Sequence, residues 1–268
     1  MLDLEFAELS DRGLTRSNNE DFLGHALPAT PAQVHSQGWL FALADGMGGH
    51  EHGEVASRLA IETILSGFRK IPKGVMHASL LPRLMQDANH AVFEAGHIDK
   101  SQPASIGMGT TLVACALRFD SAVIANVGDS RCYLFRNGAG GPLTRDHTMA
   151  TEQVRLGILS QSEAEEGNGR HLLTRSIGSE LFVAADTITV NIVPGDIILL
   201  CSDGLHGALP DQMIQHLVHA DQDLNKVAAS LIAAANHAGG HDNVTVQLIR
   251  ILSVERMGLY RGRPYRLL

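Results

Sequence analysis

Residues 110–143 read TTLVACALRFDSAVIANVGDSRCYLFRNGAGGPL, and this stretch decides the fold. It contains three apolar runs, at 110–117, 122–127 and 132–135, with connections of only a few residues between them. Connections this short join antiparallel strands, because a parallel crossover needs a dozen or more residues. The Asn137-Gly138 pair that follows is a strong signal for a hairpin turn. The stretch therefore predicts neighbouring strands of an antiparallel sheet.

On both sides of this stretch, strand-like runs and helical patterns are grouped separately. Further strands are expected at 4–9, 21–25, 39–44, 184–190, 196–201 and 244–251. Helices are expected in two pairs, from about Gly53 and Ser79, and from Pro210 and Asp223. Helices segregated from antiparallel strands indicate an α+β layered domain. Neither half of the chain is complete by itself, because the first lacks a final strand and the second lacks helices on one face. We therefore predict one domain over residues 1–254. The basic tail at 255–268 has no core pattern and is expected to be a disordered end.

The composition is that of a folded globular protein, with 44% hydrophobic and 19% charged residues. The net charge of −8 disfavours binding to nucleic acid or to an anionic membrane. No apolar run reaches the roughly 18 residues of a membrane helix, and the N-terminus lacks the pattern of a signal peptide. The three cysteines lie inside apolar runs and are expected to be reduced core residues. These features predict a cytoplasmic protein.

Four aspartates stand where an apolar strand meets a tight turn. Asp45, Asp129 and Asp203 each follow a predicted strand, and Asp242 precedes one. Any one of them alone is more often a structural turn residue than a ligand. Four carboxylates at one end of a sandwich, however, repel one another strongly unless cations lie between them. The joint pattern therefore predicts a metal site.

The ligand type indicates which metal this site binds. No Cys-x-x-Cys pair or His-x-x-x-His helix accompanies the aspartates, which disfavours zinc. Carboxylate and carbonyl oxygens suit Mg²⁺ or Mn²⁺ better. Two such ions about 3.5–4 Å apart can activate a bridging water and stabilise an in-line displacement at phosphorus.

Two further segments lie close to these aspartates in the sequence. The glycine-rich segment 46–50 lacks the Gly-Lys-Ser/Thr ending of a phosphate-binding loop, so close backbone approach is favoured over nucleotide binding, with the Gly46 carbonyl able to bind a cation. The segment 16–21 alone reads as a solvated polar loop. Beside a cation cluster, Arg16 becomes a candidate for binding phosphate oxygens, and Glu20 or Asp21 for orienting metal-bound waters. The histidines, including His147, are more often structural, and no Ser-His-Asp arrangement connects Ser130 or Ser202 to a base.

Seven motifs in order resemble the type 2C metal-dependent protein phosphatases, and the small bacterial members most closely. The resemblance covers about residues 4–251 and rests on Arg16-x-x-x-Glu20-Asp21, Ala44-Asp45-Gly46-Met47-Gly48-Gly49-His50, Gly109-Thr110-Thr111-Leu112, Asn126-Val127-Gly128-Asp129-Ser130-Arg131, Asp146-His147-Thr148, Leu200-Cys201-Ser202-Asp203-Gly204-Leu205 and Gly240-His241-Asp242-Asn243-Val244-Thr245. It implies a four-layer α-β-β-α sandwich, in which two antiparallel sheets are flanked by helix pairs. It also implies hydrolysis of phosphoserine and phosphothreonine in proteins without a phosphoenzyme.

The resemblance also implies a role for each matching residue. Asp45 bridges two core metals, Gly46 binds one of them through its carbonyl, and Asp203 and Asp242 complete the second. Asp129, with Asp203, matches a weaker third metal site. Arg16 matches the phosphate-binding arginine, and Asp21 the residue that contacts a metal through water. Residues 147–182 fall where the family has a mobile flap beside the active site.

One position departs from the eukaryotic pattern. Met47 stands where eukaryotic members place a histidine proposed to protonate the leaving alcohol. A metal-bound water, at the third site for example, must then supply that proton, and the acid is left unassigned.

The expected enzyme is a Mg²⁺- or Mn²⁺-dependent protein serine/threonine phosphatase. It is expected to act as a monomer on phosphorylated proteins that are substrates of a serine/threonine kinase. Two alternatives remain open. A catalytically silent family member would bind phosphoproteins only, but every metal carboxylate is present. A phosphodiesterase or nuclease is disfavoured by the acidic net charge and the lack of a basic groove.

Overall fold

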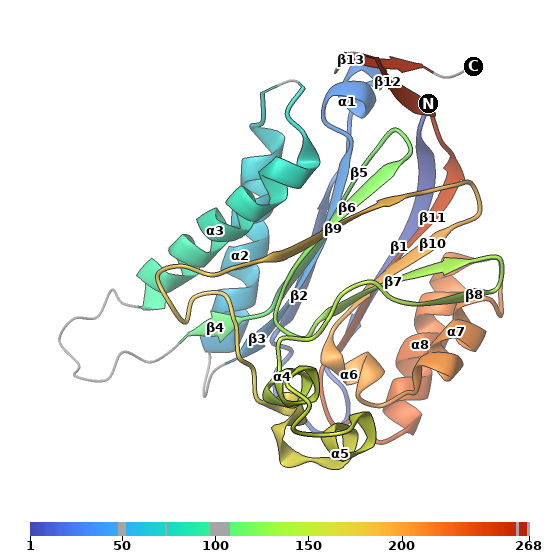
Figure 1. Ribbon diagram of the computed structural model, residues 1–268. Coiled ribbons are helices and arrows are strands. Elements are labelled where there is room, and N and C mark those ends of the chain that lie inside the picture. Colours follow the sequence, from blue (N-terminus) through green and yellow to red (C-terminus); the bar gives the residue numbers. More distant parts are fainter. Residues whose placement is uncertain (48–51, 73, 97–107, 261–262, 267–268) are drawn as a thin grey trace.

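The computed structural model describes residues 1–47, 52–72, 74–96, 108–260 and 263–266. Part of the glycine-rich segment 46–50 lies outside these ranges. Two antiparallel sheets stand at the centre of the molecule (Figure 1). The first has the order β1 (Asp3–Asp11), β11 (Val244–Ser253), β10 (Ile197–Cys201), β7 (Arg131–Arg136) and β8 (Ala139–Pro142). The second has the order β2 (Asp21–Ala26), β3 (Trp39–Met47), β5 (Leu112–Arg118), β6 (Ser121–Val127) and β9 (Asp186–Asn191), with β4 (Gly109–Thr110) paired to β3.

A pair of helices covers the outer face of each sheet (Figure 1). The helices α2 (His52–Arg69) and α3 (His77–Gly96) lie on the second sheet, and α7 (Asp211–Val218) and α8 (Leu224–His237) lie on the first. Three apolar cores result, one between each helix pair and its sheet and one between the two sheets. The central core is filled by side chains such as Phe41, Leu43 and Ile249, which are fully buried. The predicted α+β four-layer sandwich is confirmed.

The shorter elements gather mainly at one end of the sandwich. There α4 (Met149–Arg155), α5 (Gln161–Glu166) and the 3₁₀ turn η1 (Asn168–His171) lie beside α6 (Asp203–His206) (Figure 1). The polar, Glu- and Gly-rich sequence of residues 147–172 predicts an irregular insertion with only one short helical stretch, near Met149 to Leu156, so α5 and η1 were not predicted. A further short helix, α1 (Pro31–Ser36), forms between two predicted strands where no helix was predicted, because Thr30 caps it and Pro31 suits its first turn.

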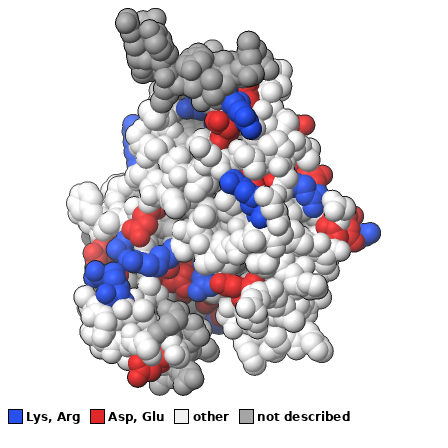
Figure 2. Space-filling model, turned by 45° about the vertical axis from the view of Figure 1, so that its right-hand side comes forward, with Lys and Arg blue, Asp and Glu red and all other residues white. Residues whose placement is uncertain are grey.

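The tail also differs from the prediction. Instead of a disordered end, β12 (Met257–Tyr260) and β13 (Arg263–Arg266) pair as an antiparallel hairpin. This hairpin lies at the end of the molecule opposite α4 and α5 (Figure 1). Within the described ranges, every helix is too short or too polar to cross a lipid bilayer. On the face shown in Figure 2, acidic and basic side chains are interspersed rather than gathered by sign.

Candidate metal centre

The predicted aspartates meet at the end of the sandwich that carries α4, α5 and α6. Asp45 lies in β3 and faces Asp21 of β2 in the strand register. Asp129 directly follows β6 and its Gly128 turn, and Asp203 opens α6 after β10. Asp242 comes just before β11, and the start of β11 lies beside the end of β10 because the two strands are antiparallel. Both sheets therefore contribute carboxylates to one place.

The carboxylates lie close enough together to raise one another's pKa values. Burial raises the pKa of Asp45 well above its usual range, and the charges of Asp21, Asp203, Asp129 and Asp242 raise it further. Burial likewise raises the pKa of Asp21 to about 7 and that of Asp129 to about 8, with the Asp203 charge adding to both. Burial also raises the pKa of Asp203, whose carboxylate shares a hydrogen bond with the Asp45 carboxyl. A cluster of acids this strongly coupled is stabilised by bound cations.

Two buried oxygens of the cluster fit such a cation. Asp21 Oδ1 and Asp203 Oδ1 are buried and have no hydrogen-bond partner among the described residues. Unpaired carboxylate oxygens of this kind are costly unless a positive charge binds them. Carboxylate oxygens suit Mg²⁺ or Mn²⁺, because these ions retain several waters and use one or two carboxylates each.

Threonine and serine hydroxyls fix the backbone around the aspartates. Thr111 Oγ1 accepts a hydrogen bond from the Asp45 amide at 2.9 Å, and the Thr111 amide donates to the Asp45 carbonyl at 2.8 Å. The same hydroxyl lies 2.7 Å from Ser130 Oγ, which ties Asp45 to the turn that carries Asp129. Ser202 Oγ donates to Asp21 Oδ2 at 2.7 Å. These hydroxyls were part of the sequence motifs, but their role as supports of the carboxylates was not predicted.

Gly46 lies where β3 meets the start of α2. Its amide donates to the Glu20 carbonyl at 3.1 Å. A Cβ at this position would come within 2.1 Å of the Gly53 carbonyl oxygen, so only glycine fits. Close backbone approach, expected from the glycine-rich sequence, is therefore present at this position. The Glu20 side chain lies against the same turn of α2, and burial raises its pKa.

Arg16 lies on a loop that Asn243 holds in place. The Asn243 side-chain amide donates to the carbonyls of Arg12 and Asn18, both at 2.9 Å, and its oxygen accepts from the Glu20 amide at 2.8 Å. Arg16 Nη2 lies 2.8 Å from Asp242 Oδ2, and its side chain is about half exposed. The predicted phosphate-binding and metal-binding residues are thus brought together, while the anchoring role of Asn243 was missed.

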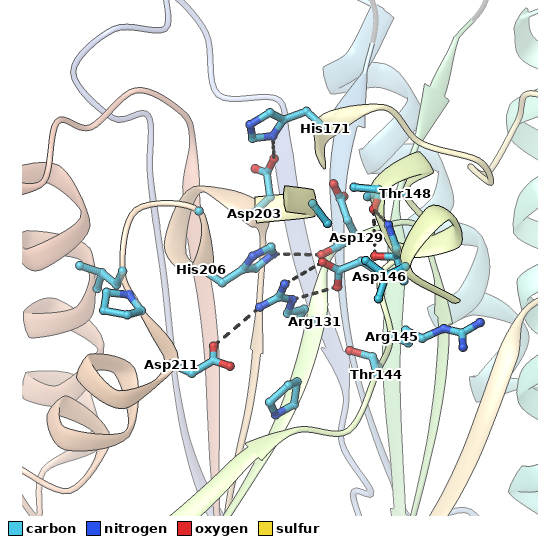
Figure 3. A pocket seen from close by; sticks show the side chains of 18 of the residues that line it. Asp129, Arg131, Thr144, Arg145, Asp146, Thr148, His171, Asp203, His206 and Asp211 are labelled. Atoms are coloured by element: carbon cyan, nitrogen blue, oxygen red, sulfur yellow. Dashed lines mark hydrogen bonds and ion pairs between the residues drawn. The ribbon is translucent and has the colours of Figure 1, made fainter. Parts of the chain in front are cut away.

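A pocket of about 830 Å³ opens beside Asp129 and Asp203, between α4 and α5 on one side and the α6–α7 segment on the other (Figure 3). Arg131 forms a bidentate pair with Asp146 in its wall, at 2.8 and 2.7 Å. His206 Nε2 lies 3.0 Å from the Asp129 carbonyl oxygen. Burial lowers the pKa of His206 to about 4, so the ring is neutral and donates this hydrogen bond through Nε2. The insertion predicted to flank the site thus forms one wall of its pocket.

Comparisons with known proteins agree with this arrangement. The profile of the family described as protein phosphatase 2C matches residues 15–253. The serine/threonine phosphatase stp of Listeria innocua is 34% identical over 259 residues, covering 95% of this chain and 96% of that protein. The protein phosphatase PhpP of Streptococcus pneumoniae is 32% identical, covering 92% of this chain and 97% of its own.

Solved structures of serine/threonine phosphatases are also similar to this chain. The serine/threonine phosphatase PstP/Ppp of Mycobacterium tuberculosis has a TM-score of 0.82 and 34% identity, covering 94% of this chain and all of the other. A catalytic domain of PstP in complex with two manganese ions has a TM-score of 0.79 and 33% identity, with 94% and 100% covered.

The four-layer fold and its carboxylate end therefore define a phosphatase that acts on proteins. The chain belongs to the protein phosphatase 2C family, the type 2C serine/threonine phosphatases, and is similar to bacterial members. The resemblance drawn from the seven sequence motifs is confirmed.

Proposed function

We propose that this phosphatase hydrolyses phosphoserine and phosphothreonine in proteins at a binuclear Mg²⁺ or Mn²⁺ centre. The observation that carries this proposal is the buried aspartate cluster, with its raised pKa values and the unpaired oxygens of Asp21 and Asp203. The related PstP structure with two manganese ions supports it. When bound, such ions lower the pKa of a water and offset negative charge on the phosphoryl group.

Within this proposal each residue has a defined position. Asp45 would hold both core ions, the Gly46 carbonyl would hold one of them, and Asp203 and Asp242 would hold the second. Asp129, together with Asp203, would hold a weaker third ion. Asp21 and Glu20 would orient waters around the centre, since Asp21 faces Asp45 in the strand register and Glu20 lies against the turn at Gly46 and Gly53.

Arg16 is the proposed phosphate-binding residue. It uses Nη2 to reach Asp242, and about half of its side chain is exposed. A planar guanidinium binds two phosphoryl oxygens at once and neutralises charge as the phosphorus–oxygen bond breaks. Met47 cannot donate a proton, so the acid for the leaving alcohol stays unassigned.

We further propose that residues 1–254 act as one domain and 255–268 as a separate basic tail. In this proposal the enzyme works as a monomer in the cytoplasm on phosphorylated proteins, opposing a serine/threonine kinase. The net charge of −8 and the interspersed charges of Figure 2 give no support to a nucleic-acid substrate.

The test is release of inorganic phosphate from a phosphothreonine peptide, with Mn²⁺ and with EDTA. We expect turnover with Mn²⁺ and none with EDTA. Metal-independent turnover would overturn the metal mechanism, and binding without turnover would favour the silent phosphoprotein binder. Hydrolysis of bis(p-nitrophenyl) phosphate in preference to the peptide would favour a phosphodiesterase.

A further inference from the structure

His147 holds the turn that carries Asp129. Gly128, the residue before Asp129, has φ +104, and a Cβ there would lie 2.7 Å from the Thr111 side chain, so glycine is required. Both main-chain groups of Gly128 bond to His147. The Gly128 amide donates to His147 Nδ1 at 3.1 Å, and the His147 amide donates to the Gly128 carbonyl at 3.0 Å.

These bonds determine the protonation of the imidazole ring. Nδ1 accepts a hydrogen bond from a backbone amide and therefore carries no proton, so the proton of the neutral ring is on Nε2. His147 Nε2 lies 3.2 Å from Asp186 Oδ2, where that proton is donated. Arg175 Nη1 lies 3.3 Å from Nε2, but both atoms are donors, and Arg175 bonds to Asp186 Oδ1 at 2.8 Å instead. The ring is 2% exposed, and burial lowers its pKa, which favours the neutral form.

The contacts of His147 join the start of the predicted flap at 147–182 to residues near its end. His147 itself starts this segment, Arg175 lies near its end, and Asp186 opens β9 just after it. The Thr174 amide donates to the His147 carbonyl at 2.8 Å, so the two limbs of the segment are also joined through the backbone. One buried side chain thus contacts the Asp129 turn on one side and Asp186 at the start of β9 on the other, where Arg175 of the flap also bonds to Asp186.

We propose that His147 is a positioning residue, which fixes the Asp129 turn through Nδ1 and links that turn to the flap through Nε2 and Asp186. The proposal rests on the proposed function in one respect, namely that Asp129 binds a metal needed for turnover. A single neutral imidazole ring then connects the Asp129 turn with Asp186, to which Arg175 of the flap also bonds.

The first test uses NMR on the full-length, metal-free protein and needs no activity. Long-range ¹H–¹⁵N spectra of His147 are expected to show a protonated Nε2 and an unprotonated Nδ1. Amide exchange at Gly128 is then compared in two variants of similar size. In His147→Asn the side-chain oxygen can take the place of Nδ1, whereas His147→Leu has no acceptor; both lose contact with Asp186. We expect exchange at Gly128 to be at least about tenfold faster in His147→Leu than in His147→Asn. A proton on Nδ1, or equal exchange in the two variants, overturns the assignment.

The second test measures turnover of a phosphothreonine peptide with Mn²⁺. His147→Leu is expected to lower kcat at least about tenfold with little change in KM, and His147→Asn to lower it less, to about the same extent as Asp186→Ala. Asp186→Ala is expected to leave Gly128 protected but to slow turnover. His25→Asn serves as the control, because His25 bonds to Glu8 away from the site. Equal kcat in the Asn and Leu variants contradicts the proposal. If the wild-type protein has no phosphatase activity, the proposed function fails, and the NMR test still decides the role of His147.

Discussion

At the scale of single residues, the acids of the centre are not equivalent. Asp45 interacts with every other aspartate of the cluster, which is why it is the proposed bridge between ions. Asp203 shares a hydrogen bond with Asp45 and lies near His171, whose Nδ1 is 4.0 Å from Asp203 Oδ2. Asp129 lies at the edge of the cluster, beside the pocket of Figure 3. Loss of Asp129 should therefore be milder than loss of Asp45.

Asp129→Asn tests this ranking. We expect the variant to bind two Mn²⁺ ions with near-normal affinity but to need at least about tenfold more Mn²⁺ for full activity, with a lower kcat, because one ligand of the weaker ion becomes neutral. Calorimetric titration counts the ions, and kinetics against Mn²⁺ concentration measure the requirement. Loss of all Mn²⁺ binding would show that Asp129 belongs to the core instead.

The sequence predicted which aspartates form the acidic cluster, but not how they are held. Asp45, Asp203 and Asp242 were recognisable because an apolar strand beside an aspartate and a turn is a local pattern. The supporting roles of Thr111, Asn243 and His147 could not be recognised in this way, because the partners of these residues come from distant segments. Asn243, for example, bonds to Arg12 and Asn18, more than 220 positions away. Contacts of that kind depend on how the two sheets align.

At the scale of helices and strands, long periodic elements were predicted well and short ones poorly. The strands of residues 110–136 and the helix pairs follow from apolar patterns that are several turns or pleats long. The helices α1 and α6 are six and four residues long, too short to show a period. The tail hairpin lacks an apolar pattern, and nothing local distinguished it from a disordered end.

The α3 helix contains a pH-sensitive contact remote from the metal centre. His77, its first residue, is 6% exposed and has Nε2 2.8 Å from the Gln37 carbonyl oxygen. Burial, with the nearby Arg118 charge, lowers the pKa of His77 to about 4. Since the unfolded value is about 6.5, the unfolded chain binds the proton first as the pH falls. The stability contributed by neutral His77 is complete above about pH 6.5 and is lost as the pH falls towards 4.

We predict that acid destabilises the wild-type protein more than His77→Gln, in which an amide N–H replaces Nε2–H. The difference in unfolding free energy between pH 7 and pH 5 should be larger in the wild type by about 2 kcal/mol. Urea unfolding at both pH values measures it, and His90→Gln on the exposed side of α3 is the control. An equal loss in wild type and His77→Gln would show that His77 does not carry the effect.

At the scale of the whole molecule, the centre lies on the seam between the two sheets. Asp45 lies near the end of a strand of the second sheet and Asp129 follows another, and Asp203 and Asp242 flank strands of the first. The central core of large buried side chains holds the sheets together, and so it also sets the spacing of the acids. The electrostatic repulsion between the clustered carboxylates therefore depends on how the whole sandwich packs.

This charge makes the stability of the metal-free protein depend on pH. Asp21 and Asp129, with pKa values of about 7 and about 8, exceed the unfolded value of about 3.9. Groups of this kind contribute stability that is complete below about pH 4 and is lost as the pH rises through 7–8. We therefore expect the gain in melting temperature caused by Mn²⁺ over EDTA to be larger at pH 8 than at pH 5, because binding at low pH must displace protons. A gain that does not change with pH would contradict this reasoning, and a smaller pH dependence is expected in Asp129→Asn.

The most direct test of the central claim is anomalous diffraction from crystals of the protein soaked in Mn²⁺. We predict two strong manganese peaks in contact with the Asp45 carboxylate, the second also in contact with Asp203 and Asp242, and no such peaks in Asp45→Asn crystals. A binuclear centre at Asp45 is contradicted if the wild-type crystals show manganese only elsewhere, or if the Asp45→Asn crystals retain both peaks.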